Sequence, residues 1–548
     1  PMGEAQVTQA LQELQKAELV YLHQGVQPLA GAGTGTAGVG VGVGVGGSAG
    51  TTSTSGAGGT GSFKHALVRD AAYGSLLKAQ RAQWHAKVAR ALEAVEPQVV
   101  QQQPQLLAGH RQQAGERAEA LELWLKAGDR SASEAAFLEA AAHYRAALRL
   151  IEAQDASPQR DASELKLLMR LSTMLAQTEG FGSSLMQDCY TRARSLASKL
   201  NDLETFVAAS SAIGGVLMAQ GRPHEVEPLF ESISAEQLAG VSLRNRLTRE
   251  AILAIATEHQ GHQRRAWPMM QAARAGLVDE WPSAGRTPGL LFRTINLLVH
   301  AAYLSLLLGR LEEADSLSRD TVLRAEETAD RVATAYALSS RALVLTDIGL
   351  PAEARVLADR SAEMARSRGL RPWATLSGIA QGLIMVDMGE VNKGLSWFQE
   401  HLDAWGREQG AFHCGEFCGF MANRLLRAGW TQQAFDLVLH AQELYRDLSE
   451  RMYAAELLRL RSRFRELEGD LDGAEAGYGE ALALATHQGA DRLALRAAES
   501  LGRLWLARAQ PGSRVQELLL PLLNASMIPR NHAEWQSAHS LVEQARGG

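Results

Sequence analysis

The chain has 548 residues, of which 46% are hydrophobic and 21% are charged, so it has enough apolar side chains for a large core. Its 55 basic and 61 acidic residues leave a formal net charge of −6, and the absence of any basic block makes nucleic acid an unlikely partner. Its three cysteines are too few for a secreted disulfide framework and no apolar run reaches the roughly 20 residues of a membrane span, so we expect a soluble, cytoplasmic protein without membrane contact.

The N-terminal segment predicts a helix, a strand and a long insert. Residues 5–19 are amphipathic, with Val7, Leu11 and Leu14 near one face, and a short extended run follows at 19–23. The tract 31–62 contains only Gly, Ala, Val, Thr and Ser. Because this composition buries little apolar surface and glycine weakens strands, we expect a disordered Gly-rich insert rather than a strand.

Four separated stretches carry a resemblance to a known family. They are FKHALVRDAAYGSLLKAQRAQWHAKVARALE (63–93), LAGHRQQAGERAEALELWLKAGDRS (107–131), SERMYAAELLRLRSRFRELEGD (449–470) and LALRAAESLGRLW (493–505). In this order they resemble the C-terminal region of multidomain signalling ATPases. Those proteins often carry a class III adenylate or guanylate cyclase domain, then an AAA-like ATPase module, then tetratricopeptide-like repeats. Lys64 and Trp84 depart from the arginine and leucine of the family pattern.

The resemblance implies a domain organisation and the roles of several residues. Residues 1–95 would be a partial winged-helix element and linker helix, with the insert at the tip of its wing, and 96–548 the repeat solenoid. His65 and His85 would tie the winged-helix element to the first helices. Since the sequence contains no G-x-x-x-x-G-K-[ST] phosphate loop, ATP and Mg²⁺ would belong to modules preceding Pro1 in a longer parent protein. We expect no cofactor in this chain.

The repeats themselves are marked by a glycine at intervals of 40 residues. A small residue precedes each glycine by seven positions and, with Val226 as the one larger exception, another follows by five; the glycines are Gly221, Gly261, Gly309, Gly349, Gly389, Gly429 and Gly469. The glycine would end the first helix of a hairpin, and the small residues would let its two helices approach closely. The pattern resembles the tetratricopeptide repeat, whose unit is about 34 residues, so we expect longer helices here. The predicted fold class is all-α, a right-handed superhelix of about nine hairpins ending near residue 507.

The predicted binding surface is the concave face, which the first helix of each hairpin lines in tetratricopeptide folds. We expect its exposed positions to contact a partner; they are Asn296, Tyr303, Tyr336, Asn423, Glu456, Arg459 and Arg463. The apolar Leu376, Ile379 and Leu383 between them would either contact a peptide or partner helix or pack the repeats together, and both readings stay open.

One further motif, HCGEFC at 413–418, places Cys414 and Cys418 on one face of a helix. A metal site needs about four ligands and the sequence shows no second cluster nearby, so we expect core packing and no metal site. No set of residues indicates catalysis.

The predicted function is a non-catalytic sensor and scaffold region. It would bind a protein, a peptide or another ligand and regulate an upstream ATPase or nucleotide cyclase module in signal transduction. Two alternatives stay open. One is the repeat region of a signalling-ATPase transcription regulator that binds a small inducer, and the other is a freestanding tetratricopeptide adaptor.

Overall fold

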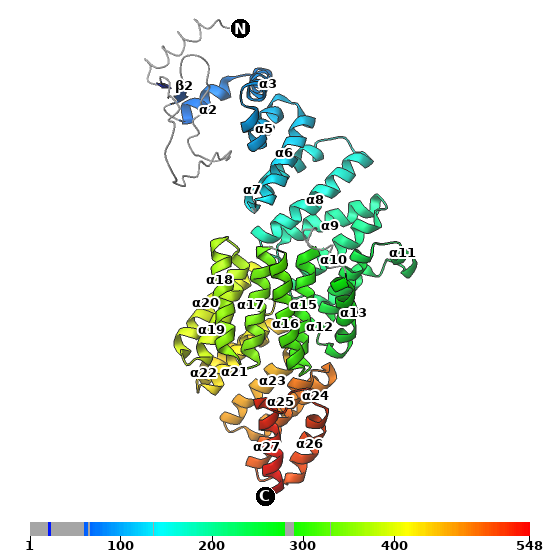
Figure 1. The fold of residues 1–548 in the computed structure, drawn as a ribbon, viewed down its shortest axis with the longest axis vertical. Coiled ribbons are helices and arrows are strands. Elements are labelled where there is room, and N and C mark those ends of the chain that lie inside the picture. The colour runs from blue at the N-terminus through cyan, green and yellow to red at the C-terminus, as the bar shows by residue number, and fades with distance from the viewer. Residues whose placement is uncertain are drawn as a thin grey trace. The chain divides into compact units, whose positions relative to one another are not determined.

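The computed structural model describes residues 20–23, 60–63, 66–134, 136–279, 290–328, 330–410 and 412–547. The chain divides into two compact units, residues 1–127 and residues 128–548 (Figure 1). The domain boundary expected at residues 95 and 96 lies within the first unit, between α3 (Lys78–Val95) and α4 (Pro97–Gln102). The predicted helix at 5–19 and residues 31–59 of the predicted insert lie outside the described residues.

The first unit contains a two-stranded antiparallel sheet. Strand β1 (Val20–His23) pairs with β2 (Thr60–Phe63), and Val20 lies opposite Phe63. Residues 60–62 were expected at the end of the disordered insert, but they belong to β2 because β1 supplies a partner for their backbone groups. The extended run expected at 19–23 corresponds to β1, and the winged-helix element stays a prediction.

The helices of the first unit are joined through His85. They are α2 (Ala66–Ser75), α3, α4, α5 (Pro104–Ala114) and the start of α6 (Arg117–Ser133). Nε2 of His85, on α3, lies 2.8 Å from the hydroxyl of Tyr73 on α2, and its Nδ1 lies 2.8 Å from Nδ1 of His110 on α5. The side chain therefore connects three helices, which is the structural role expected for it. His65 lies outside the described residues.

The second unit is a tetratricopeptide-like superhelix of antiparallel helical hairpins (Figure 1). Its elements, in chain order, are α7 (Phe137–Glu152), α8 (Pro158–Thr178), α9 (Ser184–Lys199), α10 (Leu203–Ala219), η1 (Pro223–Glu225), η2 (Glu227–Phe230), α11 (Ala235–Ala239), α12 (Leu243–His259), α13 (Gln263–Asp279), α15 (Leu290–Leu307), α16 (Leu311–Glu327), α17 (Arg331–Asp347), α18 (Pro351–Ser367), α19 (Arg371–Asp387), α20 (Val391–Gln409), α21 (Cys414–Arg427), α22 (Thr431–Asp447), α23 (Ala454–Leu467), α24 (Leu471–Gln488), α25 (Asp491–Ala507), α26 (Gly512–Ala525) and α27 (Ala533–Gly547). None of the helices in the described ranges combines the length and the apolar character needed to cross a bilayer.

The periodic glycines end the first helix of each hairpin, as expected. All seven have left-handed backbone conformations, with φ between +70° at Gly221 and +90° at Gly389. At Gly349 the glycine N–H donates to Thr346 O and the next N–H donates to Leu345 O, which satisfies the last carbonyls of α17. Helices α17 and α18 have 17 residues each, so they alone fill a 34-residue unit. The six additional residues per repeat therefore accommodate longer helices.

The small residues let the two helices of a hairpin touch through their backbones. A Cβ atom added to Gly382 on α19 would lie 2.9 Å from the carbonyl oxygen of Gly394 on α20. A Cβ atom on Gly394 would lie 2.7 Å from the carbonyl oxygen of Gly382. Real side chains do not tolerate such distances, so this crossing requires glycine on both helices.

Two parts of the superhelix differ from the prediction. The second helix of the hairpin at Gly221 is replaced by the short 3₁₀ helices η1 and η2. The stack also continues past residue 507 through α26 and α27. Ala509 follows Gly469 by 40 residues and has φ +52°, so an alanine occupies the next left-handed turn.

The superhelix closes on itself after one turn. Ser449, in the loop between α22 and α23, donates its backbone N–H to Gly221 O at 3.0 Å and contacts His224, which lies 225 residues earlier. The backbone N–H of Arg451 donates to His259 O at 2.7 Å. Helices α15 and α25 also contact each other. Repeats from successive turns therefore cover much of the concave face.

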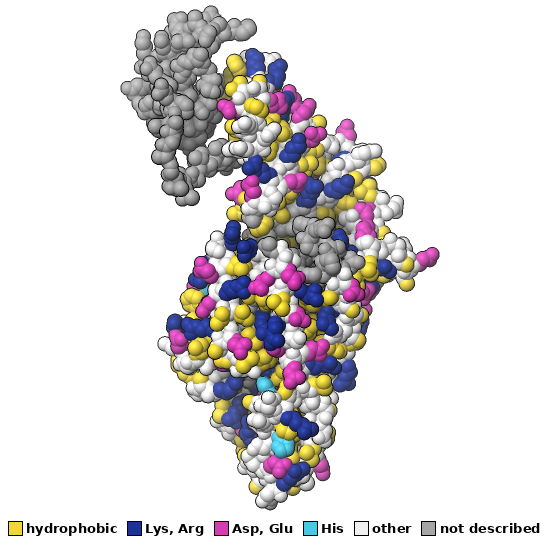
Figure 2. All heavy atoms as spheres, in the orientation of Figure 1, with side chains coloured by type: hydrophobic (Ala, Val, Ile, Leu, Met, Phe, Trp, Pro, Cys, Tyr) yellow, Lys and Arg dark blue, Asp and Glu magenta, His cyan; other side chains and the backbone are white. Residues whose placement is uncertain are grey.

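The outer surface carries both signs of charge. On the face drawn in Figure 2, acidic and basic side chains are interspersed over the repeats. This distribution agrees with the small formal net charge of −6.

Candidate functional site: a cavity in the repeat unit

The concave side of the second unit surrounds a cavity of about 1060 Å³. Side chains from α8 to α10, α12, α15, α17 and α19 line it, together with the segment before α21. Closure of the superhelix therefore narrows part of the predicted open groove into a pocket that stays open on one side. Its volume is at the upper end of the range for small-molecule sites, about 300–1,000 Å³.

One wall of the cavity is a continuous aromatic stack. Phe181 stacks on Phe292 with ring centroids 5.5 Å apart, Phe292 stacks on Tyr336 at 5.6 Å, and Tyr336 packs against Trp373 at 4.6 Å. The four rings come from different repeats. Such a wall suits an apolar or aromatic ligand, whose transfer from water would be favourable.

A polar stripe on α15 faces the aromatic wall. Arg293, Asn296, His300 and Tyr303 all line the cavity, and their spacing of three, four and three residues places them on one helix face. Asn296 accepts a 2.8 Å hydrogen bond from the hydroxyl of Tyr336. The stripe therefore places hydrogen-bonding groups beside a wall that is otherwise apolar.

Arg293 is the charged group best placed to bind a ligand. It is partly buried, and among the described residues no carboxylate forms an ion pair with it. Burial lowers the pKa of Arg293, although a guanidinium stays protonated at neutral pH. A buried cation without a counter-ion is costly, so this position favours a ligand with a carboxylate or another anionic group.

The acidic groups at the edge of the cavity already have partners. Asp129 accepts a 2.7 Å hydrogen bond from Tyr144 and pairs with Arg170 at 2.8 Å. Asp330 caps the N-terminus of α17 by accepting from the backbone N–H groups of Val332 and Ala333. Neither carboxylate is therefore available to neutralise Arg293.

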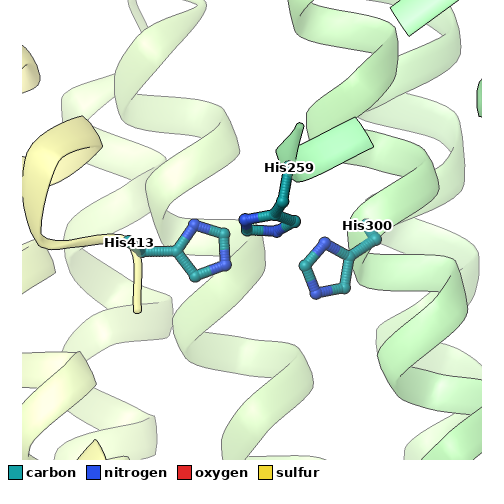
Figure 3. Close-up of side chains that lie close together, drawn as sticks. All are labelled: His259, His300 and His413. Carbon is teal, nitrogen blue, oxygen red and sulfur yellow. The ribbon is translucent and has the colours of Figure 1, made fainter. Parts of the chain in front are cut away.

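Three buried histidines lie together at one end of the cavity (Figure 3). His259 is the last residue of α12, His300 is in the middle of α15, and His413 directly precedes α21. One ring nitrogen from each lies within 4.8 Å of the other two. His300 and His413 line the cavity, whereas Phe412 stacks on His259 with centroids 4.9 Å apart.

Each histidine of this cluster faces a buried glutamate through Nδ1. The distances between Nδ1 and the carboxylate are 3.0 Å for His259 and Glu450, 3.3 Å for His300 and Glu258, and 2.7 Å for His413 and Glu416. All six side chains are at least 93% buried. We call these six residues the His–Glu cluster.

Burial shifts the titration of His259, His300, Glu258 and Glu450 towards neutral side chains. Desolvation lowers the pKa of His300 to about 4 and that of His259 well below its usual value. Desolvation also raises the pKa of Glu450 to about 7 and that of Glu258 well above its usual value. The two imidazoles are therefore neutral at physiological pH, which is the form that binds metals and accepts hydrogen bonds.

Of the seven residues predicted to be exposed on the concave face, three line the cavity and four do not. Asn296, Tyr303 and Tyr336 line the cavity, but Tyr303 and Tyr336 are only 6% and 7% exposed. Glu456 is fully buried, so the prediction that it is exposed was wrong. The physical reason is the closure of the superhelix, which places other repeats where solvent was expected.

The remaining four predicted residues lie outside the lining of the cavity. Asn423 and Arg459 bind the Glu456 carboxylate, with nitrogen–oxygen distances of 2.8 Å each. Arg463 pairs with Glu466 on its own helix. The contacts of Asn423 with Glu456 and Arg459 join neighbouring repeats, whereas Arg463 pairs within its own helix. The structure therefore brings only Asn296, Tyr303 and Tyr336 to one site.

The apolar residues Leu376, Ile379 and Leu383 were predicted either to contact a partner or to pack the repeats together, and the structure places them in different surroundings. Leu376 lines the cavity, whereas Ile379 and Leu383 are outside the lining, are at most 1% exposed, and pack the repeats together. Cys414 and Cys418 are buried in the core, as expected, and desolvation raises the pKa of Cys418 to about 12. Sequence reasoning missed Arg293, His259 and His300.

Comparisons with known proteins describe a repeat fold without assigning a family. No protein-family model matches the chain. An uncharacterized protein of Rhizobium meliloti (strain 1021) is 28% identical over 137 residues, which are 25% of this chain and 13% of that protein. The chain therefore spans only a small part of that relative.

Solved structures are similar at low identity. A Rap protein complexed with competence and sporulation factor is 14% identical, with a TM-score of 0.47 over 68% of this chain and 98% of its own. A signal transduction ATPase with numerous domains and a tetratricopeptide repeat sensor, from Pyrococcus horikoshii, is 17% identical. Its TM-score is 0.35 over 69% of this chain and 55% of its own.

Proposed function

We propose that the repeat unit is a non-catalytic ligand sensor and that its ligand binds inside this cavity. One observation carries the proposal: Arg293, which has no carboxylate partner among the described residues, stands on α15 beside an aromatic wall. The cavity thus has an apolar surface for most of a ligand and one fixed positive charge for its orientation.

The chemistry of the cavity limits the ligand. An anionic group would bind Arg293 through charge-assisted hydrogen bonds, while an apolar or aromatic body would stack near Phe292 and Trp373. The volume of about 1060 Å³ accommodates a small molecule or a few residues of a peptide, but not a long partner helix. This argument favours a small acidic ligand or a short peptide with a free carboxylate.

Ligand binding in this place would act on the closed superhelix. The cavity is lined both by repeats at α8 to α12 and by the segment at Phe412 and His413, which lies one superhelical turn later. A ligand that contacts both would stabilise the closed form over forms with an open turn. The ligand can shift the equilibrium between the closed and open forms only by the difference between its affinities for the two forms.

The regulated module is proposed from the sequence resemblance. In the resembling signalling ATPases, similar repeats follow an ATPase module and often a nucleotide cyclase. The repeat unit of this chain would therefore control ATP turnover or cyclic-nucleotide synthesis in a longer parent protein. The cavity equally suits the small inducer of a signalling-ATPase transcription regulator. Binding of such an inducer stays the second candidate function.

The binding proposal is tested by a thermal-shift screen of aromatic and aliphatic carboxylates and short peptides. Ligands that raise the Tm of the wild type should lose roughly 10- to 150-fold in affinity with Arg293→Met, as expected for one charge-assisted contact of about 1.5–3 kcal/mol. Arg503→Met, on the exposed face of α25, is the matched control and should bind normally. Equal affinities for the wild type and Arg293→Met would refute the proposal.

A further inference from the structure

The His–Glu cluster lies where the superhelix closes. His259 and His300 come from α12 and α15, whereas His413, Glu416 and Glu450 come from segments that reach them one superhelical turn later. The pair His259–Glu450 spans 191 residues of sequence. The cluster thus joins parts of the chain that no local structure holds together.

The polar atoms of the cluster are not satisfied by the protein. Nε2 of His259 and of His300 is buried and has no hydrogen-bond partner among the described residues. Both carboxylate oxygens of Glu258 and one of Glu450 are also buried without a hydrogen-bond partner among the described residues. Because unsatisfied buried groups are costly, this arrangement indicates an absent polar or cationic partner.

The orientation of the imidazoles is that of metal ligands. A metal-binding histidine typically donates its second ring N–H to a carboxylate, which fixes the tautomer and leaves the other nitrogen for the ion. Nδ1 of His259 and of His413 lies within hydrogen-bonding distance of a glutamate, so Nε2 of these two residues is left for an ion. Both ring nitrogens of His300 are buried without a hydrogen-bond partner among the described residues, so either can face an ion.

The distances require only a small adjustment. In tetrahedral zinc sites the metal–nitrogen distance of about 2.0–2.1 Å separates two ligand nitrogens by about 3.4 Å. One ring nitrogen from each of the three histidines lies within 4.8 Å of the other two. Rotations of the side chains that move these nitrogens by about an ångström would therefore bring them to the separation of metal ligands. His413 also has the unusual φ of +60°, a conformation that sites can impose on a residue with a positional role.

We propose that His259, His300 and His413 bind one divalent transition-metal ion of the class that prefers imidazole, with Zn²⁺ as the expected ion. Glu450, Glu258 and Glu416 are the positioning carboxylates behind the three ligands. Three protein ligands leave a fourth position on the ion. Since His300 and His413 line the cavity, that position is open to water or to a donor atom of a cavity ligand. The proposal does not depend on the proposed sensor function.

The test uses the full chain, freed of metal by a chelator and titrated with Co²⁺ as a spectroscopic probe and with Zn²⁺ by calorimetry. The wild type should bind one ion per chain with a Kd below about 1 µM. It should show the visible absorption of four-coordinate Co²⁺, which Zn²⁺ abolishes. His300→Ala and His413→Ala should lose this binding. Glu450→Gln should weaken it roughly 10- to 100-fold while the stoichiometry stays at one.

Exposed histidines provide the control, and His487→Gln on α24 should leave both affinity and stoichiometry unchanged. A folded wild type that takes up no Co²⁺ or Zn²⁺ would overturn the proposal, as would unchanged binding in His300→Ala and His413→Ala. If these two variants fail to fold, X-ray absorption at the zinc edge of the wild type decides. Three imidazole ligands support the site, and a shell without imidazole overturns it.

Discussion

Replacing Glu456 with glutamine should destabilise the repeat unit in a pH-dependent way. The Glu456 carboxylate is fully buried and accepts from Asn423 at 2.8 Å and from Arg459 at 2.8 Å, and Arg496 lies 3.3 Å away. Burial alone would raise the pKa of Glu456, but the two arginines outweigh it and lower this pKa to about 2. The variant removes the negative charge and leaves both guanidinium groups without that counter-ion.

The expected magnitude follows from the pKa shift. A decrease from 4.5 to about 2 at 1.36 kcal/mol per unit corresponds to about 3.4 kcal/mol of stability at pH 7. Because the folded-state pKa is the lower one, this stabilisation is complete above pH 4.5 and is lost as the pH falls towards 2. With the same two values it should decrease to about 2.6 kcal/mol at pH 4.

The assay is urea unfolding of the wild type and Glu456→Gln at pH 7 and pH 4. The free energy of unfolding should differ by about 3–5 kcal/mol at pH 7, as for other broken buried ion pairs, and by about 0.8 kcal/mol less at pH 4. Glu480→Gln, on the exposed face of α24, is the control and should change little. A pH-independent difference, or one below 1 kcal/mol at pH 7, would refute the reasoning.

Two further predictions concern the repeat backbone. Gly382→Ala should lower the free energy of unfolding by about 1–3 kcal/mol, because the new Cβ would lie 2.8 Å from Phe398 Cβ. Gly479→Ala should instead raise the free energy of unfolding by up to about 1 kcal/mol, because no atom lies within 4 Å of the new Cβ. Equal effects of these two substitutions in urea unfolding would contradict the close-approach argument. Ala509→Gly should raise the Tm, because glycine relieves a left-handed alanine that costs about 1–2 kcal/mol; an unchanged or lower Tm would show that this turn carries no strain.

The hairpin fold was predictable because its signals are local. Each glycine and each small residue acts within one hairpin, so a 40-residue period in the sequence is enough to place it. The last turn was missed because Ala509 stands where the period predicts a glycine. The replacement of one second helix by η1 and η2 had no such signal, since prolines at the same offsets from the periodic glycine lie in the intact helices α13 and α18.

The cavity was not predictable, because it depends on how small rotations between repeats accumulate over a full superhelical turn. Contacts such as that of Ser449 with His224, 225 residues earlier, have no signal in a 40-residue period. One signal was present on α15, where Arg293, Asn296 and His300 interrupt an apolar helix at helical spacing. The His–Glu cluster has none, since its histidines come from three separate elements.

The central claim is that a ligand binds inside the cavity and is oriented by Arg293. A crystal structure of the chain with the tightest carboxylate from the thermal-shift screen tests it most directly. The account predicts the carboxylate within hydrogen-bonding distance of Arg293 and the ligand body against Phe292, Tyr336 and Trp373. A ligand bound on the outer surface, with the cavity unchanged, would contradict it.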